Sequence, residues 1–125
     1  MKKRIIIALI TIISLFILSG CNENSQPNEN DITNINSLKE FNNCLADNGV
    51  VIYGSAWCPA CNALVETLGG YEKVEPIYVE CTEEEQRCTE ETKTNYVPEI
   101  QINGEVYEGP RSLEDFSQLT GCELP

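Results

Sequence analysis

The chain has 125 residues, which is room for one small domain. Its 20 acidic residues outnumber 8 basic ones, it has no histidine, and its net charge is −12 at neutral pH. A chain with this charge is not expected to bind nucleic acid, because contacts with phosphates need clusters of Lys and Arg. Seven cysteines in so short a chain indicate disulfides, redox chemistry or a metal site.

The first 20 residues have the organisation of an export signal. Three basic residues at positions 2–4 precede an apolar run over residues 5–18, and "LSGC" follows at residues 18–21. The apolar run is short for a membrane-spanning helix, which needs about 20 residues. "LSGC" resembles the prokaryotic lipoprotein signal, which implies cleavage before Cys21 and a lipid on its sulfur. The alternative is an ordinary signal peptide or an uncleaved anchor, and either would also place the following residues outside the cytoplasm.

Cleavage would remove three positive charges and no negative ones, which leaves a net charge of −15. Anionic lipid headgroups would repel such a chain, so attachment to a membrane would depend on the lipid at Cys21. Residues 22–36 are polar and rich in Asn, with almost nothing to bury, which indicates a flexible tether. We therefore expect a signal peptide at 1–20, the lipidated cysteine and tether at 21–36, and a folded domain at 37–125.

Alternating helices and strands are predicted for the domain. The apolar spacing predicts a first helix capped by Ser37 and ended by Gly49, followed by a buried strand at residues 50–54. The dipeptide Asn103-Gly104 is a strong hairpin signal between the last two strands. The elements between and after these are a helix at 59–68, a strand at 74–80, a helix-compatible segment at 82–93 capped by Thr82, the strands at 99–102 and 105–109, and a final helix capped by Ser112.

This order predicts an α/β fold with a mixed four-stranded sheet and helices on both faces. A helix joins the first two strands, so they should be parallel with a right-handed crossover. The last two strands should form an antiparallel hairpin.

The stretch "YGSAWCPACNAL" at residues 53–64 places two cysteines where a buried strand meets a helix. Cys58 would stand at the helix N-terminus, where unpaired N–H groups and the helix dipole favour a thiolate. Cys61 lies one turn further on, close enough to close a disulfide, and Pro59 suits the first helical turn. A CxxC motif beside a βαβ pattern is the thioredoxin-like signature. We predict that Cys58 is the exposed nucleophile and that Cys61 resolves the mixed disulfide.

A second feature supports this interpretation. "NYVPEI" puts Pro98 at the start of the third strand, about 40 residues after the motif. A proline in a central strand is disfavoured unless it stands first or has a special geometry. In the thioredoxin fold a cis-proline faces the CxxC motif, and the residue before it offers its backbone to an extended substrate. By this resemblance Trp57, Val97 and Pro98 would bind the substrate.

Residues 37–122 resemble the small thioredoxin-like domain that is fused to, or acts with, bacterial and archaeal homologues of vitamin K epoxide reductase. The resemblance rests on "CLADNGVVIYGSAWCPAC", "PIYVEC", "VPEIQINGEVYEG" and "RSLEDFSQLTGC". It implies an extracytoplasmic thiol–disulfide oxidoreductase with a thioredoxin-like fold and no cofactor. Its partners would be exported cysteine-containing proteins and a membrane quinone reductase of the vitamin K epoxide reductase or DsbB-like kind. We expect it to oxidise exported proteins, and the alternative is a reductase for exported cysteine proteins such as apocytochromes.

The chain departs from that family at two places. Relatives often carry His before the second cysteine, where this chain has Ala60, and Thr and Trp often follow the proline, where it has Glu99 and Ile100. A carboxylate at Glu99 would disfavour a nearby thiolate. The strand before the motif has no carboxylate to accept a proton, so proton transfer would fall to water or to Glu99.

With Cys21 lipidated, four cysteines remain beside the active pair. In the predicted fold Cys44 and Cys122 belong to the pole opposite the active site, so we expect a Cys44–Cys122 disulfide between the first and last helices. A Cys81–Cys88 disulfide would hold the acidic segment after the second strand as a structural staple. The alternative is a second redox pair.

The cysteines and glutamates also allow three other interpretations. The motif's two cysteines with Cys81 and Cys88 could offer four thiolates to zinc, although we expect no metal. The CxxC disulfide could be inert in a purely structural lipoprotein. The glutamates between residues 80 and 91 are typical of a solvated face, and the alternative is a docking surface for a basic partner.

Overall fold

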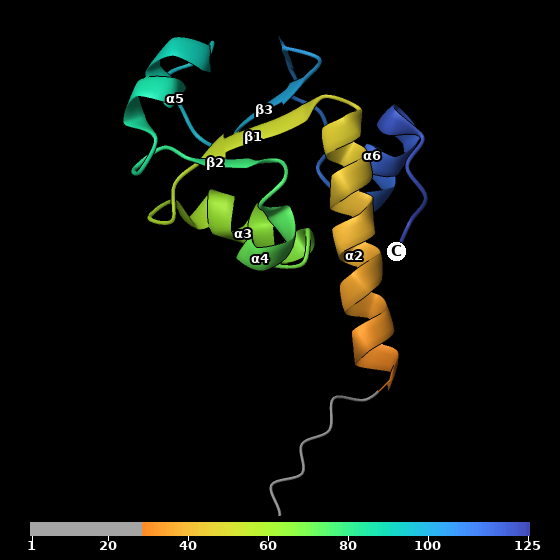
Figure 1. Ribbon diagram of the computed structural model, residues 1–125. Helices are drawn as coiled ribbons and strands as arrows, with labels where there is room; N and C mark the ends of the chain where they lie inside the picture. The colour runs from red at the N-terminus through yellow and green to blue at the C-terminus, as the bar shows by residue number, and fades with distance from the viewer. Residues whose placement is uncertain (1–28) are drawn as a thin grey trace, which may run out of the picture.

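A mixed four-stranded sheet forms the centre of the structure, a computed structural model that describes residues 29–125 (Figure 1). The strands lie in the order β2-β1-β3-β4. β1 (Val50–Gly54) is parallel to β2 (Tyr78–Glu80) and antiparallel to β3 (Glu99–Ile102), which pairs with β4 (Glu105–Val106). This arrangement confirms the predicted α/β fold and its mixed sheet.

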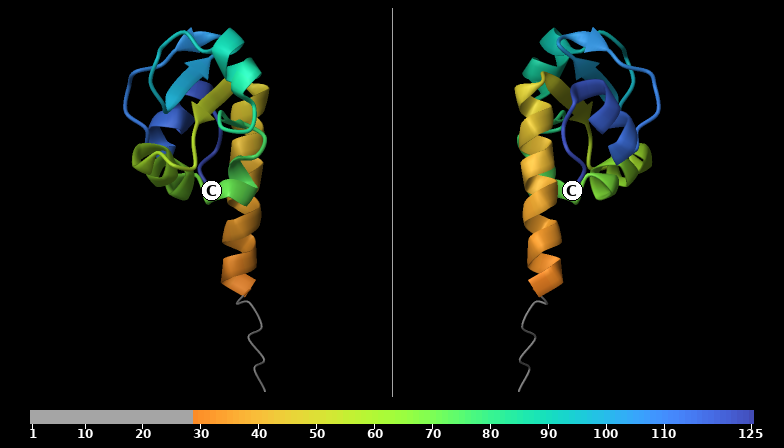
Figure 2. Two further views of the ribbon diagram at one scale, coloured as in Figure 1. Left: turned by 90° about the vertical axis from the view of Figure 1, so that its left-hand side faces the viewer. Right: turned by 90° about the vertical axis from the view of Figure 1, so that its right-hand side faces the viewer.

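Helices cover the two faces of the sheet unequally (Figures 1 and 2). One face carries α2 (Glu29–Asp47), α3 (Pro59–Thr67), α4 (Tyr71–Val74) and α6 (Leu113–Thr120), whose apolar side chains share one core with the sheet. The opposite face is covered by α5 (Glu85–Glu91). The layer of helices is therefore thinner on the face that α5 covers.

β1 is buried from both sides, which explains its continuous apolar sequence. Ile52 packs in the main core with Ile100 of β3, whereas Tyr53 faces α5 and packs with Val79 and Cys88. The end of β1, from which the CxxC motif follows, is therefore held firmly by packing on both faces of the sheet.

α2 begins earlier than the sequence analysis predicts. Residues 29–36, assigned there to the tether, are helical, and Ser37 lies inside the helix instead of capping it. In the sequence, Ile32 and Ile35 continue the apolar spacing of Leu38 and Phe41, which is the pattern of one helix face. The N-terminal part of α2 projects beyond the body of the domain (Figure 2).

The predicted export signal at residues 1–20, the lipidation site Cys21 and tether residues 22–28 lie outside the part of the chain that the structure describes. These assignments stay predictions. None of the helices between residues 29 and 125 is long and apolar enough to cross a membrane.

The second strand is shorter than the predicted span of residues 74–80. β2 starts only at Tyr78, and α4, which the sequence analysis did not predict, comes just before it. Pro76 has no N–H to donate to a strand ladder. Gly70 has a φ of 93°, a conformation that suits glycine and turns the chain from α3 into α4.

The predicted cap of the next helix, Thr82, is also wrong. Its hydroxyl donates a hydrogen bond to Glu80 Oε1 at 2.7 Å, and α5 begins only at Glu85. The N–H groups of Glu83 and Glu84 donate to the carbonyl oxygen of Glu80, so a turn separates β2 from the helix. The acidic segment is thus a tight turn followed by a short helix.

Two local predictions are confirmed at the end of the chain. Asn103 and Gly104 have φ angles of 52° and 79°, the positive values that a two-residue Asn-Gly hairpin requires. Ser112 caps α6, since its Oγ accepts a hydrogen bond from the N–H of Asp115 and the Asp115 carboxylate accepts one from the N–H of Ser112.

Two disulfides close the fold. Cys44 on α2 is bonded to Cys122, just beyond α6, across a separation of 78 residues. Cys81, just after β2, is bonded to Cys88 on α5 across a separation of 7 residues. The first bond ties two helices of the main core together, and the second pins the short helix α5 to the sheet.

Removing the two disulfides should destabilise the domain to different extents. In the chain-entropy model the long Cys44–Cys122 loop contributes about 4.5 kcal/mol and the short Cys81–Cys88 loop about 2.5 kcal/mol. Urea unfolding of the two double alanine variants should therefore show the larger loss for Cys44→Ala/Cys122→Ala. An equal loss in both, or the reverse order, would contradict this account of what holds the fold.

Candidate active site

Two free cysteines lie where β1 runs into α3. Cys58 is the N-cap residue of α3 with an extended backbone, and Pro59 occupies the first turn. Cys58 is partly exposed, whereas Cys61 is completely buried. The structure thus presents one sulfur of the motif to solvent and places the other inside the domain.

The surroundings of the two thiols shift their pKa values in opposite directions. The pKa of Cys58 is lowered, chiefly by a hydrogen bond from the Cys61 thiol and also by the backbone N–H groups of Ala60 and Cys61. The Cys61 N–H lies 3.4 Å from Cys58 Sγ. Burial raises the pKa of Cys61 to about 12. At neutral pH the exposed sulfur is therefore the better nucleophile, and the buried one is a protonated thiol.

The loop before β3 completes the site. The Val97-Pro98 peptide bond is cis, and Cys58 Sγ lies 3.7 Å from the carbonyl oxygen of Val97. Pro98 is buried and Val97 is half-buried, whereas the Trp57 side chain is 86% exposed. The structure therefore brings Val97 and Pro98 against the motif, with Trp57 projecting from the same edge.

Glu99 does not lie where the sequence analysis expects it. Successive residues of a strand face opposite sides, so Glu99 points to the face of α5 and is 1% exposed. Its carboxylate accepts hydrogen bonds from the N–H groups of Lys93 and Thr94 and from the side chains of Thr94 and Gln101. Burial raises the pKa of Glu99, but these hydrogen bonds outweigh it and the net shift is downward. Glu99 shapes the loop and does not serve the thiols.

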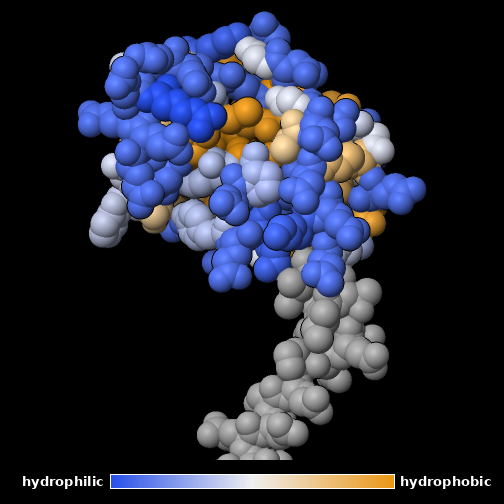
Figure 3. All heavy atoms as spheres, viewed as in Figure 1, coloured by the Kyte–Doolittle hydropathy of each residue, from blue (hydrophilic) through white to orange (hydrophobic). Residues whose placement is uncertain are grey.

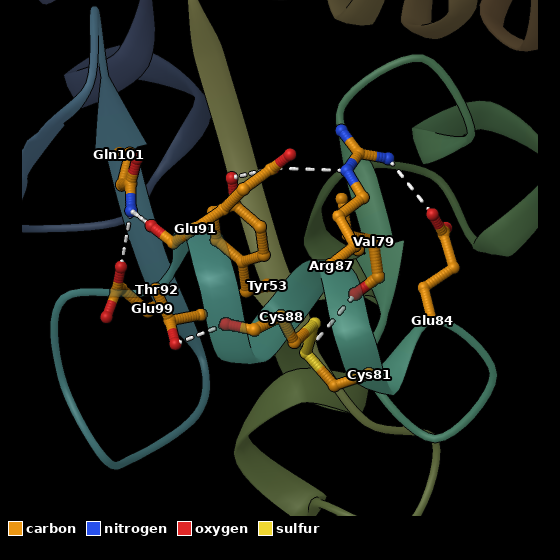
Figure 4. Close-up of polar contacts among 10 residues, drawn as sticks. All are labelled: Tyr53, Val79, Cys81, Glu84, Arg87, Cys88, Glu91, Thr92, Glu99 and Gln101. Atoms are coloured by element: carbon orange, nitrogen blue, oxygen red, sulfur yellow. Dashed lines mark hydrogen bonds and ion pairs between the residues drawn. A yellow bond between two sulfur atoms is a disulfide. The ribbon is translucent and has the colours of Figure 1, made fainter.

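A polar network on the same face joins that loop to α5 (Figure 4). The Tyr53 hydroxyl donates to Glu91 Oε2 at 2.7 Å, and burial together with this bond raises the pKa of Tyr53 to about 12. Gln101 Nε2 donates to the Glu91 carbonyl oxygen at 2.9 Å and to Glu99 Oε1 at 2.6 Å. The loop that carries Val97 is thus fixed through β3 and α5.

Two residues near the motif escaped the sequence analysis. Glu80, which pairs with Gly54 across the parallel strands, accepts a hydrogen bond from the N–H of Ala56 at 2.9 Å. The pKa of Cys61 is raised chiefly by burial and by the hydrogen bond to Cys58, and the negative charge of Glu80 makes the smallest contribution to that rise. Because the ends of parallel strands meet at one edge, the position of Glu80 at the end of β2 was the signal that could have revealed it.

Tyr78 is the second such residue. Its hydroxyl is buried without a hydrogen-bond partner among the described residues, and burial raises its pKa. The hydroxyl lies so close to Gly54 that a Cβ there would meet it at 2.3 Å. Only glycine at position 54 leaves room for this side chain, which packs edge-on against Tyr71.

Residues 50–107 match the sequence model of the glutaredoxin family. These residues form a glutaredoxin, or thioredoxin-like, domain. The match covers β1 through β4 and includes both free cysteines and the cis-proline loop. The domain and its paired cysteines together support a general assignment as a thiol oxidoreductase.

The four-thiolate zinc site considered from the sequence is not formed. The sulfurs of Cys81 and Cys88 are bonded to each other and so cannot act as thiolate ligands. Among the described residues, no group of three or more His, Cys, Asp or Glu side chains is arranged to hold a metal ion. The six cysteines of the described residues therefore form one dithiol and two disulfides.

Alkylation should separate the two thiols. Iodoacetamide at neutral pH should modify Cys58 and spare buried Cys61. The Cys61→Ala variant should show a higher pKa for Cys58, because the largest contribution to its lowering, the hydrogen bond from Cys61, is lost. The pH dependence of the alkylation rate measures both effects. An unchanged pKa in the variant, or equal modification of both cysteines in the native protein, would contradict the assigned roles.

Glu99→Gln should destabilise the domain. The variant keeps the shape but turns one acceptor oxygen into a donor facing backbone N–H groups, which should cost about 1–3 kcal/mol at neutral pH. Because the folded-state pKa of Glu99 is lowered, its stabilising effect is complete above its unfolded pKa of about 4.3 and is lost as pH falls through the folded pKa. Urea unfolding should show the difference from the native protein narrowing in acid.

The exposed Glu123→Gln variant is the matched control, and its free energy of unfolding should differ little from that of the native protein at neutral or acid pH. A Glu99→Gln variant as stable as this control would show that the Glu99 hydrogen bonds do not hold the loop.

Proposed function

We propose that this protein is an extracytoplasmic thiol–disulfide oxidoreductase that oxidises exported proteins through Cys58 and Cys61. The observation that carries the proposal is the pairing of an exposed sulfur of lowered pKa with a buried one, beside the Val97 carbonyl. A stabilised Cys58 thiolate favours the reduced form and so makes the disulfide form a better oxidant. The two other disulfides suit an oxidising compartment.

The reaction begins with Cys58 and Cys61 joined. A substrate thiolate attacks Cys58 Sγ, the bond between the two cysteines breaks, and Cys61 leaves as a thiolate that takes up a proton. A second substrate thiolate then attacks the substrate sulfur of this mixed disulfide. The substrate disulfide forms, Cys58 leaves as a thiolate, and the pair has gained two electrons.

The extended backbone at Val97 gives the substrate segment a surface to lie on during this exchange. The Val97 carbonyl oxygen is 3.7 Å from Cys58 Sγ, so a segment bonded to Cys58 passes directly beside it. Trp57, which precedes Cys58 in the chain and is largely exposed, would cover part of the segment. Burial and the hydrogen bond to Cys58 keep Cys61 protonated by raising its pKa, and the charge of Glu80, rather than that of Glu99, adds a small further rise.

Regeneration needs an electron acceptor, for which we propose a membrane quinone reductase of the vitamin K epoxide reductase or DsbB-like kind. Its own disulfide would take the two electrons from Cys58 and Cys61 and pass them to quinone. The resemblance of residues 37–122 to domains that act with such enzymes supports this partner. The signal at residues 1–20 and a lipid on Cys21 would hold the domain at the same membrane, with the projecting part of α2 as a spacer.

The reduction potential of the Cys58–Cys61 pair tests the direction of electron flow. Equilibration with glutathione buffers should give a value above about −200 mV, nearer to the strong oxidant DsbA at about −120 mV than to thioredoxin at about −270 mV. A value near that of thioredoxin would overturn the oxidase proposal and support a thiol reductase. Cys61→Ala is the control that should show no dithiol equilibrium.

A further inference from the structure

Two hollows lie near the motif: one is lined by Trp57, the neighbour of Cys58 in the chain, and the other by Val97, whose carbonyl oxygen lies 3.7 Å from Cys58 Sγ. The first has a volume of about 450 Å³ and is lined by three aromatic residues, two glutamates and two small residues. They are Trp57, Tyr71, Tyr78, Glu80, Glu83, Ala56 and Thr82. The second, of about 380 Å³, is bounded by the Cys81–Cys88 disulfide and Glu85 on one side and by Val97 on the other. A substrate segment that is bonded to Cys58 and passes the Val97 carbonyl would lie next to the second hollow.

The acidic segment at residues 80–85 contributes to the wall of both hollows. Most of the other acidic groups nearby are already engaged. Arg87 forms ion pairs with Glu84 at 3.2 Å and with Glu91 at 3.1 Å (Figure 4), and Glu80 accepts hydrogen bonds from backbone and threonine donors. Of the glutamates that line the two hollows, Glu83 and Glu85 are therefore the ones whose carboxylates are free to contact a substrate.

Glu83 and Glu85 remain without an ion-pair partner among the described residues. Both are exposed, and no side chain of the described residues forms a hydrogen bond or ion pair with either carboxylate. No Lys or Arg is among the residues that line the two hollows. Arg87 lines a further hollow with Glu83 and Glu85, but its ion pairs are with Glu84 and Glu91. Arg111 lines a separate hollow with Ala60 and Thr67.

Aromatic rings accompany these charges. Trp57 is 86% exposed and Tyr71 is 45% exposed, although the face of the domain seen in Figure 3 is mostly hydrophilic. An aromatic face next to a free carboxylate binds the stem and head of a Lys or Arg side chain, through apolar contact, cation–π attraction and charge. The same arrangement repels carboxylates.

We propose that the substrates are polypeptides in which Lys or Arg lies close to the reactive cysteine, and that Glu83 and Glu85 select them. The inference rests on the proposed disulfide exchange and names its substrate class. A cationic residue on either side of the substrate cysteine would enter one of the two hollows while the cysteine is bonded to Cys58. Acidic partners, including small anionic thiols, would be disfavoured at the same positions.

Exchange rates with charge-graded peptides test this inference. Three dithiol peptides of one sequence would differ only at the two residues beside one cysteine, which are both Lys, both Ser or both Glu. The oxidised protein should react with the Lys peptide about tenfold faster than with the Glu peptide at low salt, which corresponds to two exposed ion pairs of ordinary strength. The ratio should shrink as salt is added.

A matched pair of variants separates local selection from the general negative charge. Glu83→Gln/Glu85→Gln should reduce the Lys-to-Glu rate ratio to about twofold, since each lost ion pair contributes a small factor. Glu40→Gln/Glu123→Gln removes the same charge beside a hollow at the opposite pole, near the Cys44–Cys122 disulfide, and should leave the ratio unchanged. All four residues are exposed, so both variants should stay folded.

Two outcomes would overturn the inference alone. One is equal rates with all three peptides, and the other is an equal fall of the ratio in both variants, which would assign the preference to net charge. If none of the peptides exchanged disulfides while the fold was intact, the proposed function itself would fail. The two failures are therefore distinguishable in one series of measurements.

Discussion

The antiparallel pairing of β1 with β3 is the constraint on which the site depends. Its last registered pair is Tyr53 with Glu99. Beyond that pair the two strands continue into the two halves of the site: β1 leads into the CxxC motif, and β3 is entered through the Val97-Pro98 loop. Because this register brings the end of β1 next to the start of β3, Cys58 Sγ and the Val97 carbonyl oxygen lie 3.7 Å apart.

Because side chains alternate along β1 and β3, different interactions hold the site in place on the two faces of the sheet. On the face of the main core, apolar packing fixes β1 and buries Cys61 at the start of α3. On the face of α5, the Glu99 carboxylate binds the backbone of the loop, and the Cys81–Cys88 disulfide anchors the helix that completes the network. The end of the sheet that carries Cys58 is therefore held by apolar packing on one face and by hydrogen bonds and a disulfide on the other.

Features written in local sequence were predictable, and features set by register were not. The CxxC motif at a strand–helix junction, the Asn103-Gly104 hairpin and the Ser112 cap depend on neighbouring residues. The burial of Glu99 depends on which face of β3 meets α5, and the influence of Glu80 depends on the parallel register with β1. The early start of α2 was hidden because weak helix formers surround its apolar positions.

The most direct test of the account maps the mixed disulfide that forms during exchange. The Cys61→Ala variant cannot resolve the intermediate, so a peptide activated as a mixed disulfide should become trapped on the protein. Mass spectrometry should find the peptide on Cys58, with the Cys44–Cys122 and Cys81–Cys88 bonds intact. A peptide trapped on Cys81 or Cys88, or no trapped peptide at all, would contradict the assignment of Cys58 as the exchange centre.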